Sequence, residues 1–388
     1  MYNVMYVNMK NKFLALMREL VSSSNRYKLR AVAGRLRELI NRACLWNWEV
    51  ALLLRKGVGS CDIIYIGRKS QRDMAKAILN INQQPDGSST IESGADRRVI
   101  VSEVPLPGAI RVPTFLGSRV RLGRPIEEIT SNFHSQLRRE LKKARSRYRL
   151  RQVLDNGEIE RIDQTMLRPY AKARHGLGAA QISSDEVKKE SQQYGRLDLL
   201  LFDDDEVGCQ LSHSSIREGK SYWTANRFGY PDDVFSDPKR LRDINSMNNH
   251  LAMEWAIENG FDFYDIGGAL GRPGDGLLEW KRRRGSELYT DSISGYFHIR
   301  LPKVGTPQFL WDKPLFAVEY HQLTLHLGLP DVQSDEEIAS RYREMGFGGL
   351  FKVYLHCATP PSYHLLDEIR SYYAHQKVPP TVKVIVAV

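Results

Sequence analysis

Residues 197–228 constrain the fold of this 388-residue chain more tightly than any other segment. Three apolar runs, LDLLLF, VGCQLSHSSI and SYWTANRF, are separated by the charged turns DDDE and REGK. Short apolar runs between tight polar turns are typical of antiparallel strands joined by hairpins. The segment therefore predicts a three-stranded antiparallel meander.

A helix and a buried strand follow the meander. Apolar residues recur at helical spacing from Ile244 to Trp255, and Gly260 supplies a C-terminal stop. The run FDFYDI then has the continuous apolar character of a buried strand. Together with a short helix and a final strand, ELYTDSISGYFHI, these elements predict a mixed α/β sheet with a V-shaped opening.

The segment FYDIGGALGRPGDGLLEWKRRRG, residues 263–285, places Asp265 at a strand end, followed by glycines and four consecutive bases. Ligands gather beyond the carboxyl ends of strands in α/β sheets, and Gly267 and Gly268 would let a substrate or another backbone approach closely. The segment predicts a pocket that holds an anionic acyl donor beside a reacting carbonyl. The simpler interpretation is a strand–loop–helix joint with a solvated end.

Residues 250–285 resemble the Fem-type aminoacyl-tRNA-dependent transferases and their GNAT relatives. The resemblance implies an α/β fold of twin GNAT-like domains, with mixed, mostly antiparallel sheets flanked by helices. It assigns residues 1–124, completed by 301–388, to the first domain and residues 125–300 to the second. The residues that carry it are Trp255-Ala256, Gly260, Tyr264-Asp265, Gly267, Gly276-Leu277 and Trp280-Lys281.

The resemblance also implies a reaction, the transfer of an acyl group, often an aminoacyl group from tRNA, to an amine. It associates Lys281 with stabilising negative charge at the reacting end of the donor. Trp280, expected to contact substrate, stands where the family usually has phenylalanine, and the arginine run 282–284 is longer than the pattern needs. The coiled-coil arm of several cell-wall members is missing, so we expect a small-molecule or peptide amine as acceptor.

These residue types suit amide formation. Attack of an amine on an ester or thioester passes through a tetrahedral oxyanion, which needs an aimed donor and aligned substrates. Lys281 could supply the charge without a covalent intermediate, and Asp265 could orient the amine or Lys281, or accept a proton. Alternatively, Asp265 caps the loop and Lys281 only pairs with Glu279 or Asp275.

Further substrate-binding candidates lie outside this segment. The third meander strand carries Tyr222, Trp223 and Asn226 at the face that a substrate would line, although aromatic strand residues are more often core. Arg174 and His175 could contact an anionic acceptor. Alternatively, these two bases complement the dipole at a helix C-terminus.

The chain is strongly basic, with 56 Lys and Arg against 46 Asp and Glu. Such a field attracts polyanions, including nucleic acid and nucleotide-linked substrates. The bases concentrate in a predicted helix over residues 133–151, for which a solvated amphipathic face is the alternative interpretation. Phosphate or nucleic-acid contacts are expected from Arg138, Arg139, Lys142, Lys143, Arg145, Arg282, Arg283 and Arg284.

Several donor classes stay open. A pyrophosphate-binding R/Q-x-x-G-x-G/A loop between a strand and a helix is missing, because the one literal match, residues 343–348, follows a helix and precedes a strand. Together with the basic charge, this favours aminoacyl-tRNA over acyl-CoA or an acyl carrier. The competing class is a non-catalytic RNA-binding module on a GNAT scaffold, which would not need Lys281.

No cofactor or metal site is expected. The four cysteines are scattered without a CxxC pair, and neither HExxH nor GxSxG occurs. Scattered cysteines fit a reducing cytoplasm, and the apolar runs are too short to span a membrane. The first 55 or so residues are expected to be helical, and the sequence leaves the oligomeric state open.

Overall fold

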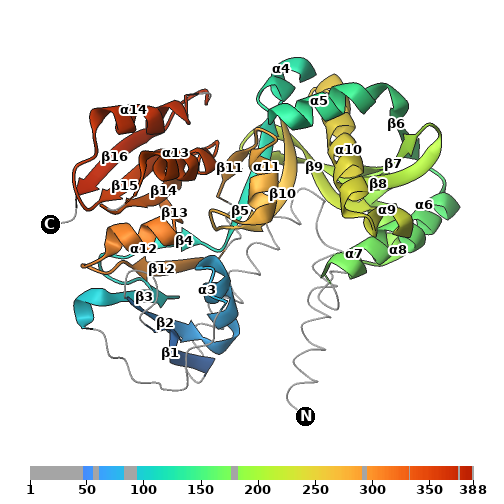
Figure 1. Cartoon of the computed structure of the whole chain (residues 1–388). Helices are drawn as coiled ribbons and strands as arrows, with labels where there is room; N and C mark the ends of the chain where they lie inside the picture. Colours follow the sequence, from blue (N-terminus) through green and yellow to red (C-terminus); the bar gives the residue numbers. More distant parts are fainter. Residues whose placement is uncertain are drawn as a thin grey trace, which may run out of the picture.

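The computed structural model describes residues 47–55, 61–82, 94–175, 182–290, 295–331, 333–374 and 376–386. Within these residues the strands form three sheets (Figure 1). Most strand pairs are antiparallel, and helices flank the sheets, which confirms the predicted mixed α/β class.

The N-terminal sheet has five strands in the order β1-β2-β3-β12-β4. Its core includes Phe309 and Leu310 of a helix far along the chain. The elements are β1 (Trp48–Leu54), β2 (Asp62–Arg68), β3 (Arg98–Ser102), β12 (Tyr296–Arg300), β4 (Ile110–Pro113), α3 (Arg72–Ile78) and α12 (Thr306–Asp312).

The central sheet has seven strands in the order β11-β5-β10-β9-β8-β7-β6. The predicted meander is confirmed as β7, β8 and β9, which pair antiparallel through two charged turns. The strands are β11 (Glu287–Tyr289), β5 (Phe115–Arg121), β10 (Phe263–Leu270), β9 (Lys220–Gly229), β8 (Asp205–Arg217), β7 (Gly195–Phe202) and β6 (Tyr148–Val153).

Helices cover both faces of the central sheet. Leu200 of β7 packs into the cluster that contains α10, whereas its neighbours Leu197 and Leu199 are in the cluster with α6 and α8. The first face has α4 (Ile126–Ser131), α5 (Ser135–Ala144), α7 (Arg168–His175), α9 (Asp232–Phe235) and α10 (Pro238–Glu258); the second has α6 (Asn156–Ile162) and α8 (Ser184–Gln193).

The C-terminal sheet has four strands in the order β13-β14-β15-β16, and it confirms the predicted strand–helix–strand unit near the C-terminus. Its core is shared with Leu116 of β5 and Leu278 of α11, so this sheet packs against the central one. The elements are β13 (Leu315–Glu319), β14 (Gln322–Leu329), β15 (Lys352–Cys357), β16 (Thr381–Val386), α13 (Asp335–Glu344), α14 (Tyr363–Ser371) and α11 (Gly276–Arg282).

The strands cross the boundaries of the expected twin domains. β5, placed by the sequence in residues 1–124, joins the central sheet, and β12, placed in 125–300, joins the N-terminal sheet. Of residues 301–388, α12 packs on the N-terminal sheet, whereas β13–β16 form a sheet of their own. The final strand expected over 287–299 is two strands in different sheets, β11 and β12.

Two predicted helices contain strands. Residues 1–46 lie outside the described residues, but Trp48–Leu54 is β1, paired with β2. The helix expected over 133–151 ends at Ala144, and Tyr148–Val153 is β6. The run YRLRQV also has the period-two alternation of a strand, and pairing with β7 satisfies its backbone.

Candidate functional site

The parallel strands β9 and β10 separate at the middle of the central sheet. They pair only from Tyr222 to Thr224 on β9 and from Phe263 to Asp265 on β10. Beyond this point β9 continues to Gly229 and β10 to Leu270. The two strands therefore form the V-shaped opening expected from the sequence.

The separation coincides with a bulge at Gly267. The register of β10 against β5 shifts between Asp265 and Gly268. Gly267 has a φ of 77°, a left-handed conformation that favours glycine, and its N–H donates to the Asp265 carboxylate at 2.8 Å. Because a bulge interrupts pairing and redirects the strand, this short stretch accounts for the opening.

A cavity of about 570 Å³ fills the opening, and we name it the β9–β10 cavity. Its volume is within the range of small-molecule sites. Its walls come from both strands, α7, α10 and α11. The lining residues are Tyr170, Ala173, Arg174, Phe228, Phe235, Pro238, Leu241, Arg242, Asn245, Asn249, Ile266, Gly268, Gly276, Leu277, Trp280 and Lys281.

Lys281 is the most deeply buried cation of this lining, with 1% of its surface exposed. Its Nζ donates to the Gly267 carbonyl at 2.6 Å and to the Gly268 carbonyl at 2.9 Å. Burial lowers the pKa of the ammonium to about 8, against the opposing effect of Asp265 and Asp275. An ammonium has three donors, so one N–H remains for a ligand atom.

The charge of the cavity is one-sided. Its charged lining residues are Arg174, Arg242 and Lys281, and no carboxylate lines it among the residues that the structure describes. A group that carries or develops negative charge is therefore favoured here over a cation.

Asp265 is buried beside this cavity without lining it. Its carboxylate accepts hydrogen bonds from Arg217 Nη1 and the Tyr289 hydroxyl, both at 2.7 Å, as well as from the Gly267 N–H. These partners hold the carboxylate in place. The Gly267 N–H links it to the residue whose carbonyl accepts from Lys281.

Comparison with known proteins adds distant structural likenesses. No family model and none of the curated proteins matches the chain. The chain is similar to FemX, with 12% identity over 66% of this chain and 89% of that one and a TM-score of 0.38. It is similar to L-PGS from Bacillus licheniformis, with 13% identity over 61% of this chain and 76% of that one and a TM-score of 0.33. It is also similar to a GCN5-related N-acetyltransferase from Sphaerobacter thermophilus, with 11% identity over 65% of this chain and 74% of that one and a TM-score of 0.29. These are Fem-type and GNAT proteins, the classes that the sequence resembles, together with L-PGS. At such TM-scores the likenesses support no argument about substrates.

Three of the predicted substrate contacts lie on the cavity wall. Trp280 lines the cavity, and the Arg284 guanidinium carbon lies over the Trp280 ring, 3.6 Å from the ring centroid. Arg174 donates to the Tyr170 hydroxyl at 3.1 Å and faces the same space. Gly268, the third, is exposed at the bulge.

The meander candidates are placed elsewhere. Trp223 is buried against Trp255 and Phe261, which is the core role given above as the alternative. Tyr222 points to the opposite face, and Asn226 donates to Glu190. Neither Trp223 nor Asn226 lines the β9–β10 cavity. His175 ends α7, and its side chain lies outside the described part of the chain.

The predicted phosphate contacts have different surroundings. Arg145 is held by Glu254, with 42% of its side chain exposed. Arg284 is buried and donates to Ser246, a placement that does not fit a surface phosphate contact. Arg282 and Arg283 share the Glu279 carboxylate. Four bases are exposed along α5: Arg138, Arg139, Lys142 and Lys143.

Sequence reasoning missed the polar residues that α10 contributes to the cavity. Asn249 donates to the Asn245 carbonyl and accepts from the Tyr264 hydroxyl, and Asn245 accepts from Tyr230. Asn245 and Asn249 are four residues apart, beside the apolar stripe of the helix. Two asparagines at this spacing on a helix with an apolar face are the signal that could have identified them.

The N-terminus of α10 is closed by its own cap. The Asp237 carboxylate accepts from the N–H groups of Lys239 and Arg240. Free N–H groups at a helix N-terminus are what would bind a pyrophosphate. Here the Asp237 carboxylate occupies the N–H groups of Lys239 and Arg240, so these two groups are not available to a pyrophosphate.

Metal-ligand clusters and membrane spans are both missing from the described ranges. These ranges contain no group of three or more His, Cys, Asp or Glu side chains placed to hold a metal ion. They also contain no helix that is both long and apolar enough to cross a membrane.

Proposed function

We propose that this chain is an N-acyltransferase that forms an amide bond, with its acyl donor bound in the β9–β10 cavity. The observation that carries the proposal is the position of Lys281, a buried ammonium in the wall of a cavity that opens where two parallel strands part. The resemblance over residues 250–285 assigns the same lysine to the reacting end of the donor.

The chemistry follows from the remaining Lys281 N–H. The amine nitrogen attacks the acyl carbon, the carbonyl oxygen gains negative charge, and the carbon–oxygen bond of the ester then breaks. The alcohol leaves with a proton that the amine gives up. A fixed ammonium beside the carbonyl oxygen stabilises the tetrahedral state, because its charge is already in place before the reaction.

The donor we propose is an aminoacyl-tRNA, and the acceptor is an amine of a small molecule or peptide. The Asp237 cap at α10 removes the helix N-terminus on which CoA pyrophosphate would depend. The exposed bases of α5 offer a surface for a phosphate backbone. Both observations favour an RNA-linked ester over acyl-CoA.

A binding protein without turnover is the second candidate. The observation in its favour is that two carbonyls already hold the Lys281 ammonium, as they would in a purely structural role. Such a protein would retain the basic surface and need no reacting group beside it.

Replacing Lys281 with Met tests the two candidates. Binding of charged tRNA and of CoA is first measured at several salt concentrations. Transfer of a labelled amino acid from mixed aminoacyl-tRNA to a pool of small amines and peptides is then followed. The proposal predicts tRNA binding without CoA binding, and a loss of transfer of about 100-fold or more in Lys281→Met with tRNA affinity retained. Transfer that survives in Lys281→Met would overturn it.

A further inference from the structure

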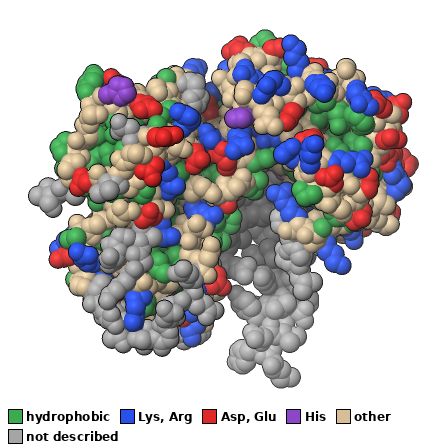
Figure 2. Space-filling view, in the orientation of Figure 1, with side chains coloured by type: hydrophobic (Ala, Val, Ile, Leu, Met, Phe, Trp, Pro, Cys, Tyr) green, Lys and Arg blue, Asp and Glu red, His purple; other side chains and the backbone are tan. Residues whose placement is uncertain are grey.

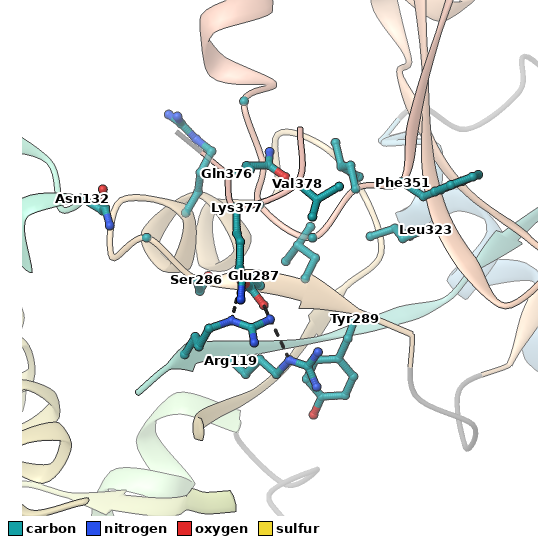
Figure 3. A pocket seen from close by; sticks show the side chains of 18 of the residues that line it. Arg119, Asn132, Ser286, Glu287, Tyr289, Leu323, Phe351, Gln376, Lys377 and Val378 are labelled. Carbon is teal, nitrogen blue, oxygen red and sulfur yellow. Dashed lines mark hydrogen bonds and ion pairs between the residues drawn. The ribbon is translucent and has the colours of Figure 1, made fainter. Parts of the chain in front are cut away.

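A second and larger cavity, of about 1270 Å³, lies between the central and C-terminal sheets, and we name it the interlayer cavity. Its walls are the edge strand β11 and its neighbour β5, the end of α11 and three loops of the C-terminal sheet. Figure 3 shows Lys377, from a loop of the C-terminal sheet, extending toward Glu287 and Arg119 of the central sheet. This cavity shares no lining residue with the β9–β10 cavity.

Cations outnumber carboxylates in this lining. It contains two carboxylates, Glu218 and Glu287, among the residues described. Its cations are Arg119, Arg121, Arg124, Arg217, Arg282, Arg283 and Lys377.

The ion pairs compensate part of this charge, since Arg124 pairs with Glu128 and Arg217 pairs with Asp265. Four other arginines share two carboxylates. Glu287 accepts from Arg121 at 3.3 Å and also lies 4.0 Å from Arg119. Glu279, just outside the lining, is likewise shared by Arg282 and Arg283. In each case two guanidinium groups share one carboxylate, so each arrangement keeps a net positive charge. Bases placed around one space repel each other unless an anion lies among them.

The positive surface continues from the cavity along α5. Asn132 and His134 line the cavity immediately before this helix, and the His134 N–H donates to the Arg283 carbonyl at 2.9 Å. The exposed bases of α5, from Arg138 to Lys143, then extend over about 7.5 Å along the helix axis. Figure 2 shows Lys and Arg side chains gathered over this upper part of the molecule.

We propose that the interlayer cavity and α5 bind a single-stranded nucleic-acid segment, with its phosphates on the arginines. The cavity exceeds the usual volume of a small-molecule site, which favours an extended ligand over one nucleotide. Phe351, with 43% of its surface exposed at the rim, offers a stacking surface for a base. The inference deepens the donor proposed above by naming where its RNA strand lies.

The test is fluorescence anisotropy with a labelled single-stranded octaribonucleotide, titrated at several salt concentrations. The variant is Arg121→Ala with Arg283→Ala, whose side chains are 45% and 55% exposed, and its melting temperature checks the fold. The control is Arg147→Ala with Arg149→Ala, which removes two exposed, ion-paired arginines near the opposite edge of the sheet.

We expect affinity to fall at least tenfold in the cavity variant, and the slope of log K against log salt to fall by about 1.4, or 0.7 for each lost phosphate contact. The control should bind as the unmodified protein does. Equal binding by all three proteins would overturn the inference. So would a cavity variant that loses inorganic tripolyphosphate binding while its octanucleotide affinity is unchanged.

The outcomes separate this inference from the proposed function. If amide formation is absent but octanucleotide binding depends on Arg121 and Arg283, the binding site stands and the transferase proposal fails. If the cavity variant transfers amino acids with an unchanged KM for tRNA, the transferase proposal stands and this site fails.

Discussion

Asp265 and Lys281 are coupled through a single residue, since Gly267 donates its N–H to the Asp265 carboxylate and accepts a hydrogen bond from Lys281 Nζ. The strand-end carboxylate therefore sets the orientation of the peptide groups that hold the ammonium. Arg217 and Tyr289 fix the carboxylate from the other side. Asp265, outside the cavity, thus helps to fix the position of the Lys281 ammonium in the cavity wall.

Replacing Asp265 with Asn should lower kcat with little change in the KM of the donor, because Lys281 loses its position and not its binding surface. The Asp265 charge raises the pKa of Lys281, so its loss should shift the alkaline limb of the pH–rate profile to lower pH. Arg217 would lose its charged partner in a partly buried site while it keeps its hydrogen bond to Tyr289. This loss should cost about 2 kcal/mol of unfolding free energy. An unshifted alkaline limb would contradict the coupling.

The pKa of Lys281, lowered to about 8 by burial, predicts how transfer depends on pH. Because the protonated form is the one that stabilises an oxyanion, kcat should fall as pH rises through 8. The arginine in Lys281→Arg should stay charged beyond pH 9. The kcat of this variant should therefore not fall as pH rises through 8, whatever its absolute value. A rate that rises through pH 8 would instead indicate that the neutral amine acts as a base.

The lowered pKa of Lys281 also predicts how stability depends on pH. The folded pKa of Lys281 is below the unfolded value near 10.5, so the unfolded chain binds more protons between pH 8 and 10.5. Stability should therefore rise with pH in this window, by at most about 1.4 kcal/mol per pH unit. Denaturant unfolding of the protein and of Lys281→Met, compared at pH 7.5 and 10, measures the difference. Parallel changes in both proteins would show that the lysine is not responsible.

His326 and His356 form a buried pair, with Nδ1 and Nε2 3.0 Å apart, across β14 and β15. Burial lowers the pKa of His326 to about 3 and that of His356 to about 4. Both are neutral in the fold, so their stabilising contribution is complete above pH 6.5 and is lost as pH falls toward 4.

Replacing both His326 and His356 with Phe should flatten the fall in unfolding free energy between pH 6.5 and 4. The exposed His364 offers a control, since His364→Gln should leave that fall unchanged. An equally steep fall in the double variant would assign the acid sensitivity to other groups.

Gly267→Ala tests the bulge. The site has open space for a Cβ, so a φ of 77° is the only obstacle. Strain should cost about 1–2 kcal/mol of unfolding free energy, and relaxation of the bulge should reduce kcat by displacing the carbonyls that hold Lys281. Gly94→Ala is the control, because Gly94 also has open space for a Cβ, has no positive φ and lies outside the β9–β10 cavity.

The sequence predicts the parts of this site that are local in the chain. The meander, the helix that ends at Gly260, and the strand carrying Asp265 each have their own periodic pattern, and the cavity opens among them. Arg217 and Tyr289 could not be predicted as partners of Asp265, because they are 48 and 24 residues away and meet it only through sheet order.

Two errors have simple physical causes. Tyr222 and Trp223 were expected to line one face, but adjacent strand residues point to opposite faces, and Trp223 takes the core side. The basic segment 133–151 has the helical period in its first part and the period of a strand in its last residues. The last residues belong to β6, because pairing with β7 satisfies their backbone groups.

The position of β12 has a consequence for biosynthesis. This strand lies between β3 and β4 in the N-terminal sheet, yet it is translated after every strand of the central sheet. During vectorial synthesis β4 therefore has no neighbour on its inner side until residue 300 has left the ribosome. The central sheet can form first, so the earliest-translated sheet is the later of the two to be completed.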